Sequence, residues 1–163
     1  MKIMTVVRIT KNFKDIDVCL PTLEGLVKAV CSRFSEHQTS DTRYEISIAL
    51  VNNAEIRKLN IRFLNRNATT DCLSFDLSDS EPNSTKTFEL VINAETAVKQ
   101  AGLKGHSVQA ELALYITHAL LHQFGFDDSE EAQAKKMHDT EDEILQQLGF
   151  EAVYNRNNEQ QIH

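Results

Sequence analysis

The chain has 163 residues, a length that suits one domain with a buried core. Its 17 basic and 24 acidic side chains give a formal net charge of −7, which argues against broad nonspecific adhesion to nucleic acid but not against a local basic surface. No segment approaches the roughly 18 apolar residues of a membrane helix, and residues 1–10 lack the apolar stretch of a secretory signal. The 3 cysteines are scattered, without a Cys-x-x-Cys pair, as is typical of a reducing interior. We therefore expect a cytoplasmic protein with no membrane partner.

The first third of the chain predicts two strands and two helices. Residues 5–9 read as a short strand, and a helix is predicted after Pro21 because apolar residues follow at spacings of three and four. A polar loop over residues 35–42 leads to strict alternation over residues 44–50, which predicts a second strand with one face more buried. Asn52, with Glu55 three residues later, resembles a capping box and predicts a second helix.

The remaining elements follow at regular intervals. The patterns predict a strand at 73–77, a loop at 78–86, a strand at 87–92, a helix at 94–101, a helix that Ser107 caps, and a last helix at 129–147. Gly102 and Gly105 are expected to stop the third helix. The helix after Ser107 is apolar nearly all round, so it should be central. We expect an α+β fold, with a small mixed four-stranded sheet and about five helices, in a single domain over residues 1–153 followed by a loose polar tail at 154–163.

His118 and His122 provide the clearest chemical signal in the chain. They are four residues apart within the largely apolar segment 112–124, so on a helix they lie on the same face and can bind one ion. Gly125 permits a turn that can bring Asp127 or Asp128 back as a third ligand. This pattern predicts a metal site on the central helix with room for water. His37, His106 and His138 lack such spacing and are expected at the surface.

The same stretch resembles the H-x-x-x-H-x-x-G-x-D-H signature of the YbeY family, bacterial metal-dependent endoribonucleases that act in ribosomal RNA maturation. Residues 59–60 (L-N) and 70–75 (T-D-C-L-S-F) resemble two further blocks of that family, L-N-x-x-Y-R and T-[DN]-V-L-S-F, and residues 137–149 resemble its closing helix. The resemblance covers roughly residues 43–150. Two positions depart from the family pattern: Asp128 replaces the third metal histidine, and Leu64 replaces an arginine.

The resemblance implies one zinc ion held by His118, His122 and Asp128. Carboxylate oxygen is an accepted zinc ligand beside two imidazoles. Asp127, where the family also has aspartate, is expected to support these ligands without binding the ion. An alternative for Asp128 is a structural one, in which it caps the last helix with Glu131 three residues later.

On the substrate side, the resemblance implies cleavage of single-stranded RNA. The expected function is zinc-dependent endoribonuclease activity in ribosomal RNA processing, including maturation of the 16S rRNA 3′ end and ribosome quality control, with ribosomal RNA and ribosomal particles as partners. Arg62 and Arg66 flank Leu64, and either could supply the missing cation or be a solvated surface charge. Ser74 could donate to a phosphate or simply face the other side of the sheet.

Other metal chemistries fit the residues less well. A metalloprotease of the H-E-x-x-H type needs a glutamate beside its first histidine, where this chain has Ala119. A structural zinc site normally has four protein ligands and favours cysteine. Two alternatives remain open: a metal-dependent hydrolase of another phosphoester, and a ribosome-assembly factor whose catalysis is weakened, as the loss of arginine at Leu64 would allow.

Overall fold

The structure, a computed structural model, describes residues 3–35, 42–79 and 85–150. Within these ranges the chain forms four strands and five helices. In chain order they are β1 (Ile3–Lys11), α1 (Leu20–Phe34), β2 (Thr42–Val51), α2 (Asn53–Leu64), β3 (Cys72–Asp76), β4 (Lys86–Asn93), α3 (Ala94–Lys104), α4 (Val108–Gln123) and α5 (Glu131–Gln147). The predicted α+β fold is therefore confirmed. The tail predicted at 154–163, and His37, lie outside the described residues.

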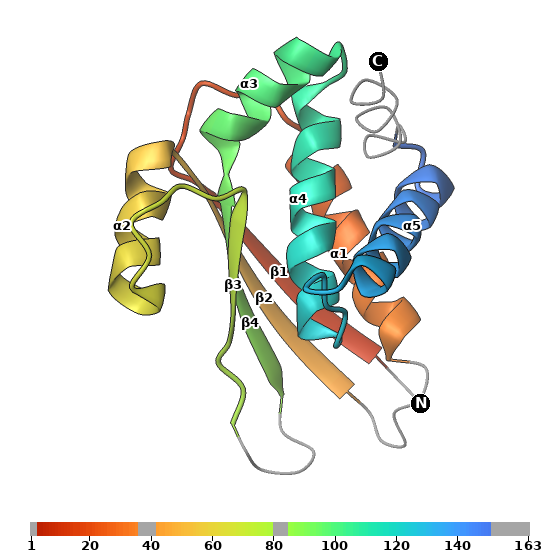
Figure 1. Cartoon of the computed structure of the whole chain (residues 1–163). Helices are drawn as coiled ribbons and strands as arrows, with labels where there is room; N and C mark the ends of the chain where they lie inside the picture. The colour runs from red at the N-terminus through yellow and green to blue at the C-terminus, as the bar shows by residue number, and fades with distance from the viewer. Residues whose placement is uncertain (1–2, 36–41, 80–84, 151–163) are drawn as a thin grey trace.

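The sheet is mixed, with strand order β1-β2-β4-β3. The first three strands in this order run parallel, and β3 pairs antiparallel with β4 at one edge. Helices make the crossovers between the parallel strands, as this topology requires. The edge strand β3 is short and lies next to the central helix in Figure 1.

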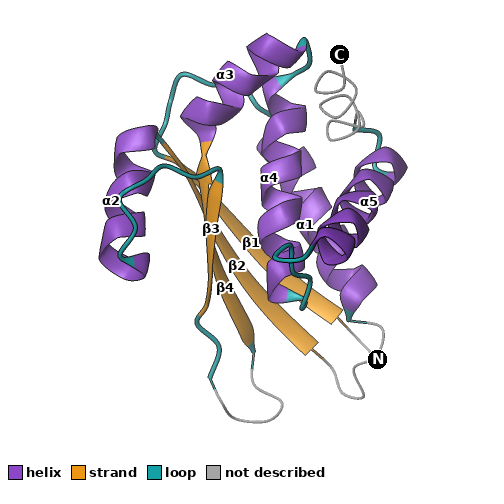
Figure 2. Cartoon of the chain, viewed as in Figure 1, coloured by secondary structure: helices purple, strands orange, loops and turns teal. Residues whose placement is uncertain are grey.

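Helices cover the two faces of the sheet unequally. Figure 2 shows α1, α4 and α5 on one side of the strands and α2 on the other. Side-chain alternation along β3 agrees with this arrangement, because successive residues of a strand point to opposite faces. The Ser74 hydroxyl accepts a hydrogen bond of 2.9 Å from Gln123 on α4, whereas the ring of Phe75 packs against Phe63 on α2 with centroids 5.5 Å apart.

Helix α4 is the centre of the larger core. Its side chains at Leu112, Ile116 and Leu120 are fully buried, and it packs against α1, α3, α5, β3 and β4. The Ser107 hydroxyl accepts a hydrogen bond from the Ala110 N–H, so the predicted cap is confirmed. A helix buried on all sides gives its side chains little freedom, and this is the helix that carries both histidines.

Several predicted boundaries differ from the structure. Helix α3 continues through Gly102 and ends at Gly105, which adopts the left-handed conformation (φ 73°). Glycine inside a helix is tolerated at a cost of about 1 kcal/mol, whereas the left-handed position favours it. Strand β3 covers Cys72–Asp76, so Leu77 lies beyond its end, and α5 begins two residues later than predicted.

Candidate metal centre

His118 and His122 lie near the C-terminal end of α4, and their Nε2 atoms are 3.2 Å apart. The chain then turns at Gly125, whose φ of 93° is in the region that favours glycine. The Phe126 N–H donates to the Leu121 carbonyl and closes this turn. As a result, Asp128 returns to the histidines: its Oδ2 lies 3.4 Å from Nε2 of His118 and 3.8 Å from Nε2 of His122.

These three distances fit a single tetrahedral ion. Ligand atoms about 2.0–2.2 Å from a tetrahedral zinc lie about 3.4 Å from one another. The observed separations of 3.2, 3.4 and 3.8 Å bracket that value. Two imidazole nitrogens and one carboxylate oxygen would leave a fourth position free, and Asp128, whose side chain is 42% exposed, keeps the site in contact with solvent.

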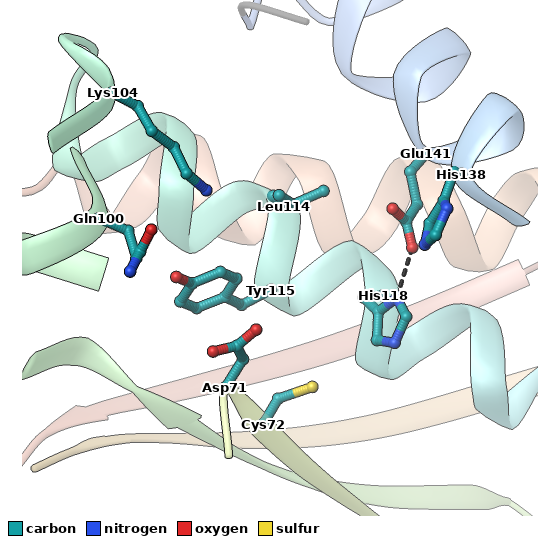
Figure 3. Close-up of a pocket in the computed structure, with 9 residues that line it drawn as sticks. All are labelled: Asp71, Cys72, Gln100, Lys104, Leu114, Tyr115, His118, His138 and Glu141. Atoms are coloured by element: carbon teal, nitrogen blue, oxygen red, sulfur yellow. Dashed lines mark hydrogen bonds and ion pairs between the residues drawn. The ribbon is translucent and has the colours of Figure 1, made fainter. Parts of the chain in front are cut away.

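Both histidines are oriented through their other ring nitrogen. Nδ1 of His118 lies 2.5 Å from Oε1 of Glu141 on α5, and Nδ1 of His122 lies 3.2 Å from the Phe126 carbonyl oxygen. Each acceptor favours the tautomer with hydrogen on Nδ1, which leaves the Nε2 lone pair for a metal. Figure 3 shows Glu141 reaching from α5 to His118.

Glu141 also controls the charge of His118. Burial alone lowers the pKa of this histidine, but the hydrogen bond and negative charge of Glu141, together with Asp128 and Asp71, outweigh burial and raise the pKa above its ordinary value. Because the Glu141 side chain is only 1% exposed, its charge is poorly screened. A metal cation would replace the proton in this anionic setting.

A second group of possible ligands shares His118 with His138 and Glu141. The contact of 2.5 Å between His118 and Glu141 is a hydrogen-bond distance, well below the ~3.4 Å between two ligands of one tetrahedral ion. The rings of His118 and His138 stack at 6.4 Å. We therefore interpret Glu141 and His138 as support for His118, with the metal on the side of His122 and Asp128.

Asp127 lies beside the site with a different set of contacts. Its carboxylate accepts hydrogen bonds from the backbone N–H and the hydroxyl of Ser129, which lower its pKa. These bonds fix the turn that carries Asp128. The capping interpretation of Asp128 is wrong, because α5 begins after Glu130 and the Asp128 carboxylate is directed to the histidines instead.

The predicted RNA-binding residues lie in two places. Ser74 is on the α4 side of the sheet, bonded to Gln123, one residue beyond His122. Arg62 and Arg66 belong to α2 and the segment that follows it, on the opposite side of β3 (Figure 1). The Arg62 guanidinium lies over the Phe63 ring at 5.2 Å. The structure thus brings the three predicted metal ligands together and leaves both arginines away from them.

Sequence patterns missed two buried or site-facing histidines and one carboxylate. The predicted surface position of His106 is wrong, because its side chain is fully buried against Glu111. His138 is half-buried and lines the cavity beside His118. Glu141 had a detectable signal. It lies four residues after Met137 and four before Leu145, both fully buried, so an acid at that position must have a buried partner.

A cavity of about 330 Å³ opens beside His118. Its lining, drawn in Figure 3, consists of Asp71, Cys72, Gln100, Lys104, Leu114, Tyr115, His118, His138 and Glu141. Burial, with the nearby charge of Asp71, raises the pKa of the Cys72 thiol to about 12. This thiol therefore stays neutral in the metal-free protein, and neither group of possible metal ligands among the described residues includes it.

Comparison with known proteins identifies relatives of the whole domain. A family described as Endoribonuclease YbeY matches residues 8–149. Proteins named "Endoribonuclease YbeY" from Alkaliphilus metalliredigens and Carboxydothermus hydrogenoformans are 32% and 35% identical over 142 and 141 residues, covering 84% and 86% of this chain and 91% and 96% of those proteins. The solution structure of TM1509 from Thermotoga maritima has a similar fold, with a TM-score of 0.52, 20% identity, and coverage of 87% of this chain and 91% of that one. Among the described residues, no helix is both long and apolar enough to cross a membrane.

Proposed function

The chain belongs to the endoribonuclease YbeY family, and we propose that it is a zinc-dependent enzyme that cuts single-stranded RNA during ribosomal RNA processing. Membership of this family makes it an endoribonuclease, with RNA as its substrate. The observation that carries the zinc proposal is the triangle of His118, His122 and Asp128, whose ligand atoms lie 3.2–3.8 Å apart.

The donor set favours zinc among the common metals. Imidazole nitrogen with carboxylate oxygen at three positions is typical of catalytic zinc sites, whereas magnesium and calcium prefer oxygen ligands alone. When bound, such an ion polarises a phosphoryl oxygen and lowers the pKa of a bound water. The chain's own residues supply the geometry: Glu141 and the Phe126 carbonyl fix the two imidazole rings, and Asp127 fixes the turn that holds Asp128.

Restriction to single-stranded RNA is supported by the recessed site. The cavity beside His118 is lined by side chains of α3, α4 and α5 and by residues at the start of β3, so a base must leave its stack to enter it. We propose that Arg62 and Arg66 bind backbone phosphates where the RNA leaves the site and passes the edge strand β3. Ser74, on the α4 side of β3, is proposed to contact the strand between these positions.

The proposed biological substrate is ribosomal RNA, with maturation of the 16S rRNA 3′ end and quality control of ribosomal particles as the processes served. This part of the proposal rests on the family resemblance.

A ribosome-assembly role with weakened catalysis is the second candidate. Leu64 is 46% exposed where the family has arginine, and its neighbours Ile61 and Phe63 are 44% and 55% exposed. Three exposed apolar side chains on α2 are suited to contact with a protein or ribosomal surface. In this case the protein would bind ribosomal particles without cutting their RNA.

Cleavage of defined RNA by the purified protein separates these functions. A labelled single-stranded RNA and the same strand in a duplex are incubated with metal-free and zinc-loaded protein, with His122→Ala as the control. The proposed function requires cleavage of the single strand that a chelator abolishes and zinc restores. Cleavage that survives metal removal, or equal cleavage of the duplex, would contradict it.

A further inference from the structure

The cavity beside the metal centre extends away from it along α4. His118, His138 and Glu141 line one end, and Gln100 and Lys104 of α3 line the other, as Figure 3 shows. Lys104 pairs with Glu111, which precedes His118 by seven residues, so the two ends are about 10 Å apart at 1.5 Å per helical residue. A nucleotide whose phosphodiester lies at His118 can place its base in such a space.

The charges in and around this cavity disfavour a second phosphate. The Lys104 ammonium already pairs with buried Glu111 at 3.4 Å, and Glu111 also contacts His106 at 2.6 Å. The lining itself contains two carboxylates, Asp71 and Glu141, and Glu111 lies outside it as the partner of Lys104. At the end of the cavity away from the metal centre, Asp71 and Glu111 therefore face one lysine that is already paired, which disfavours a further anion and favours a neutral group that donates hydrogen bonds.

Asp71 brings a solvent-exposed carboxylate to the lining of the cavity. Its carboxylate makes no hydrogen bond or ion pair with any described residue, although its backbone carbonyl accepts from the Asn93 N–H. Partial burial and the charge of Glu111 raise its pKa, against the opposing effect of His118 and Lys104. Because no described residue donates to its two oxygens, a ligand with adjacent N–H donors can bind both of them in place of solvent.

We propose that this cavity binds one nucleobase of the RNA, next to the bond that is cut, and that Asp71 makes it selective for guanine. Guanine offers two adjacent donors, N1–H and the N2 amino group, to the two carboxylate oxygens. Its O6 accepts from Gln100 or Lys104. Tyr115 and Leu114 provide an aromatic and an apolar wall for the base. The inference rests on the proposed cleavage of single-stranded RNA.

The other bases match these groups less well. Uracil has a single donor, N3–H. The carbonyl oxygens on either side of it would also face the carboxylate of Asp71. Cytosine and adenine each offer one amino group beside an unprotonated ring nitrogen, so only one of the two carboxylate oxygens gains a donor. Selection therefore follows from the number of donors on the base edge.

The first test is the sequence at the cut site. Zinc-loaded protein cleaves a random-sequence single-stranded RNA, and the product ends are sequenced. We expect guanine to be enriched at one position beside the cut, and Asp71→Asn to reduce this preference roughly tenfold or more, as loss of a bidentate base contact does. Asp76→Asn, at the far end of β3 and outside the cavity lining, is the control and should keep it.

The second test does not depend on cleavage. Binding of guanosine, uridine and inorganic phosphate to the zinc-loaded protein is followed by chemical-shift changes, with fold and zinc content checked for every variant. We expect guanosine to perturb Tyr115 and Gln100, with weaker binding in Asp71→Asn and in Gln100→Ala. Equal binding of uridine, phosphate bound in preference to guanosine, or a guanine preference unchanged in Asp71→Asn would overturn the pocket. Absence of cleavage with guanosine still bound through Asp71 would instead contradict the proposed function alone.

Discussion

Glu141→Gln is expected to weaken zinc binding while leaving the protein folded. Glutamine has the shape of glutamate, and its amide oxygen can still accept the Nδ1–H of His118. The substitution therefore keeps the ring orientation and removes only the negative charge. Because the glutamate is 1% exposed and 2.5 Å from His118, that charge acts through little solvent.

The size of the loss in zinc affinity depends on whether a substitution removes only the charge of Glu141 or also its hydrogen bond to His118. Loss of a partner that supports a metal ligand lowers affinity roughly 10–100-fold, or about 1.4–2.7 kcal/mol. Glu141→Gln, which keeps the hydrogen bond, should lower the affinity for zinc about tenfold. Glu141→Ala, which removes both the charge and the hydrogen bond that orients His118, should lower the affinity for zinc by close to a hundredfold.

Zinc titration against a competing chelator measures both variants. Glu143→Gln is the matched control, since Glu143 lies on the same helix, is 54% exposed and pairs with Arg33 away from the site. Circular dichroism of the metal-free proteins checks that all remain folded. If Glu141→Gln bound zinc within about twofold of the wild type, the assigned role of this carboxylate would be refuted.

The contact between His118 and Glu141 also predicts that the stability of the metal-free protein depends on pH. The pKa of His118 is raised in the folded state, so its contribution to the free energy of unfolding is fully present below its unfolded value of about 6.5. The contribution is lost as pH rises through the folded pKa. Urea unfolding at a series of pH values above 6.5 should therefore show a decline in the wild type that is smaller in Glu141→Gln; parallel curves would contradict the assignment.

Three further sets of substitutions test the ligands and the RNA contacts. His118→Ala or His122→Ala should abolish stoichiometric zinc in elemental analysis, since two ligands hold the ion weakly; full occupancy would rule out the site. Asp128→His should keep zinc and Asp128→Asn should weaken it, and unchanged chelator competition by the Asn variant would show that this carboxylate is no ligand. The Arg62→Ala, Arg66→Ala double variant should weaken RNA binding and flatten its salt dependence by a slope of about 1.4, the value for two phosphate contacts on a single strand, without loss of zinc; an unchanged slope would place both arginines outside the RNA path.

The sequence predicted those parts of the fold that depend on local patterns. Alternation located the strands within one or two residues, and the caps at Asn52 and Ser107 are confirmed by hydrogen bonds to Glu55 N–H and Ala110 N–H. Spacing on one helix was also sufficient to pair His118 with His122. These features are set by neighbouring residues, so no tertiary contact is needed to infer them.

Features that depend on packing between distant segments were not predictable in this way. Glu141 reaches His118 from 23 residues away because α5 crosses α4, and no local pattern fixes that crossing. The burial of His106 depends likewise on Glu111, five residues ahead, turning inward at the start of α4. The position of Arg62 across the sheet from the histidines follows from strand order, which helix and strand periodicity leave open.

Because α4 is buried on all sides, the stability of the fold does not depend on a bound metal. The helix is held by apolar contacts with the sheet and with α1 and α5, and none of these contacts needs an ion. In contrast to small zinc domains, which unfold when metal is withdrawn, this protein should stay intact through periods of metal starvation. The proposed ligands would remain aligned, and the proposed zinc-dependent activity would return when zinc did, without new synthesis or refolding.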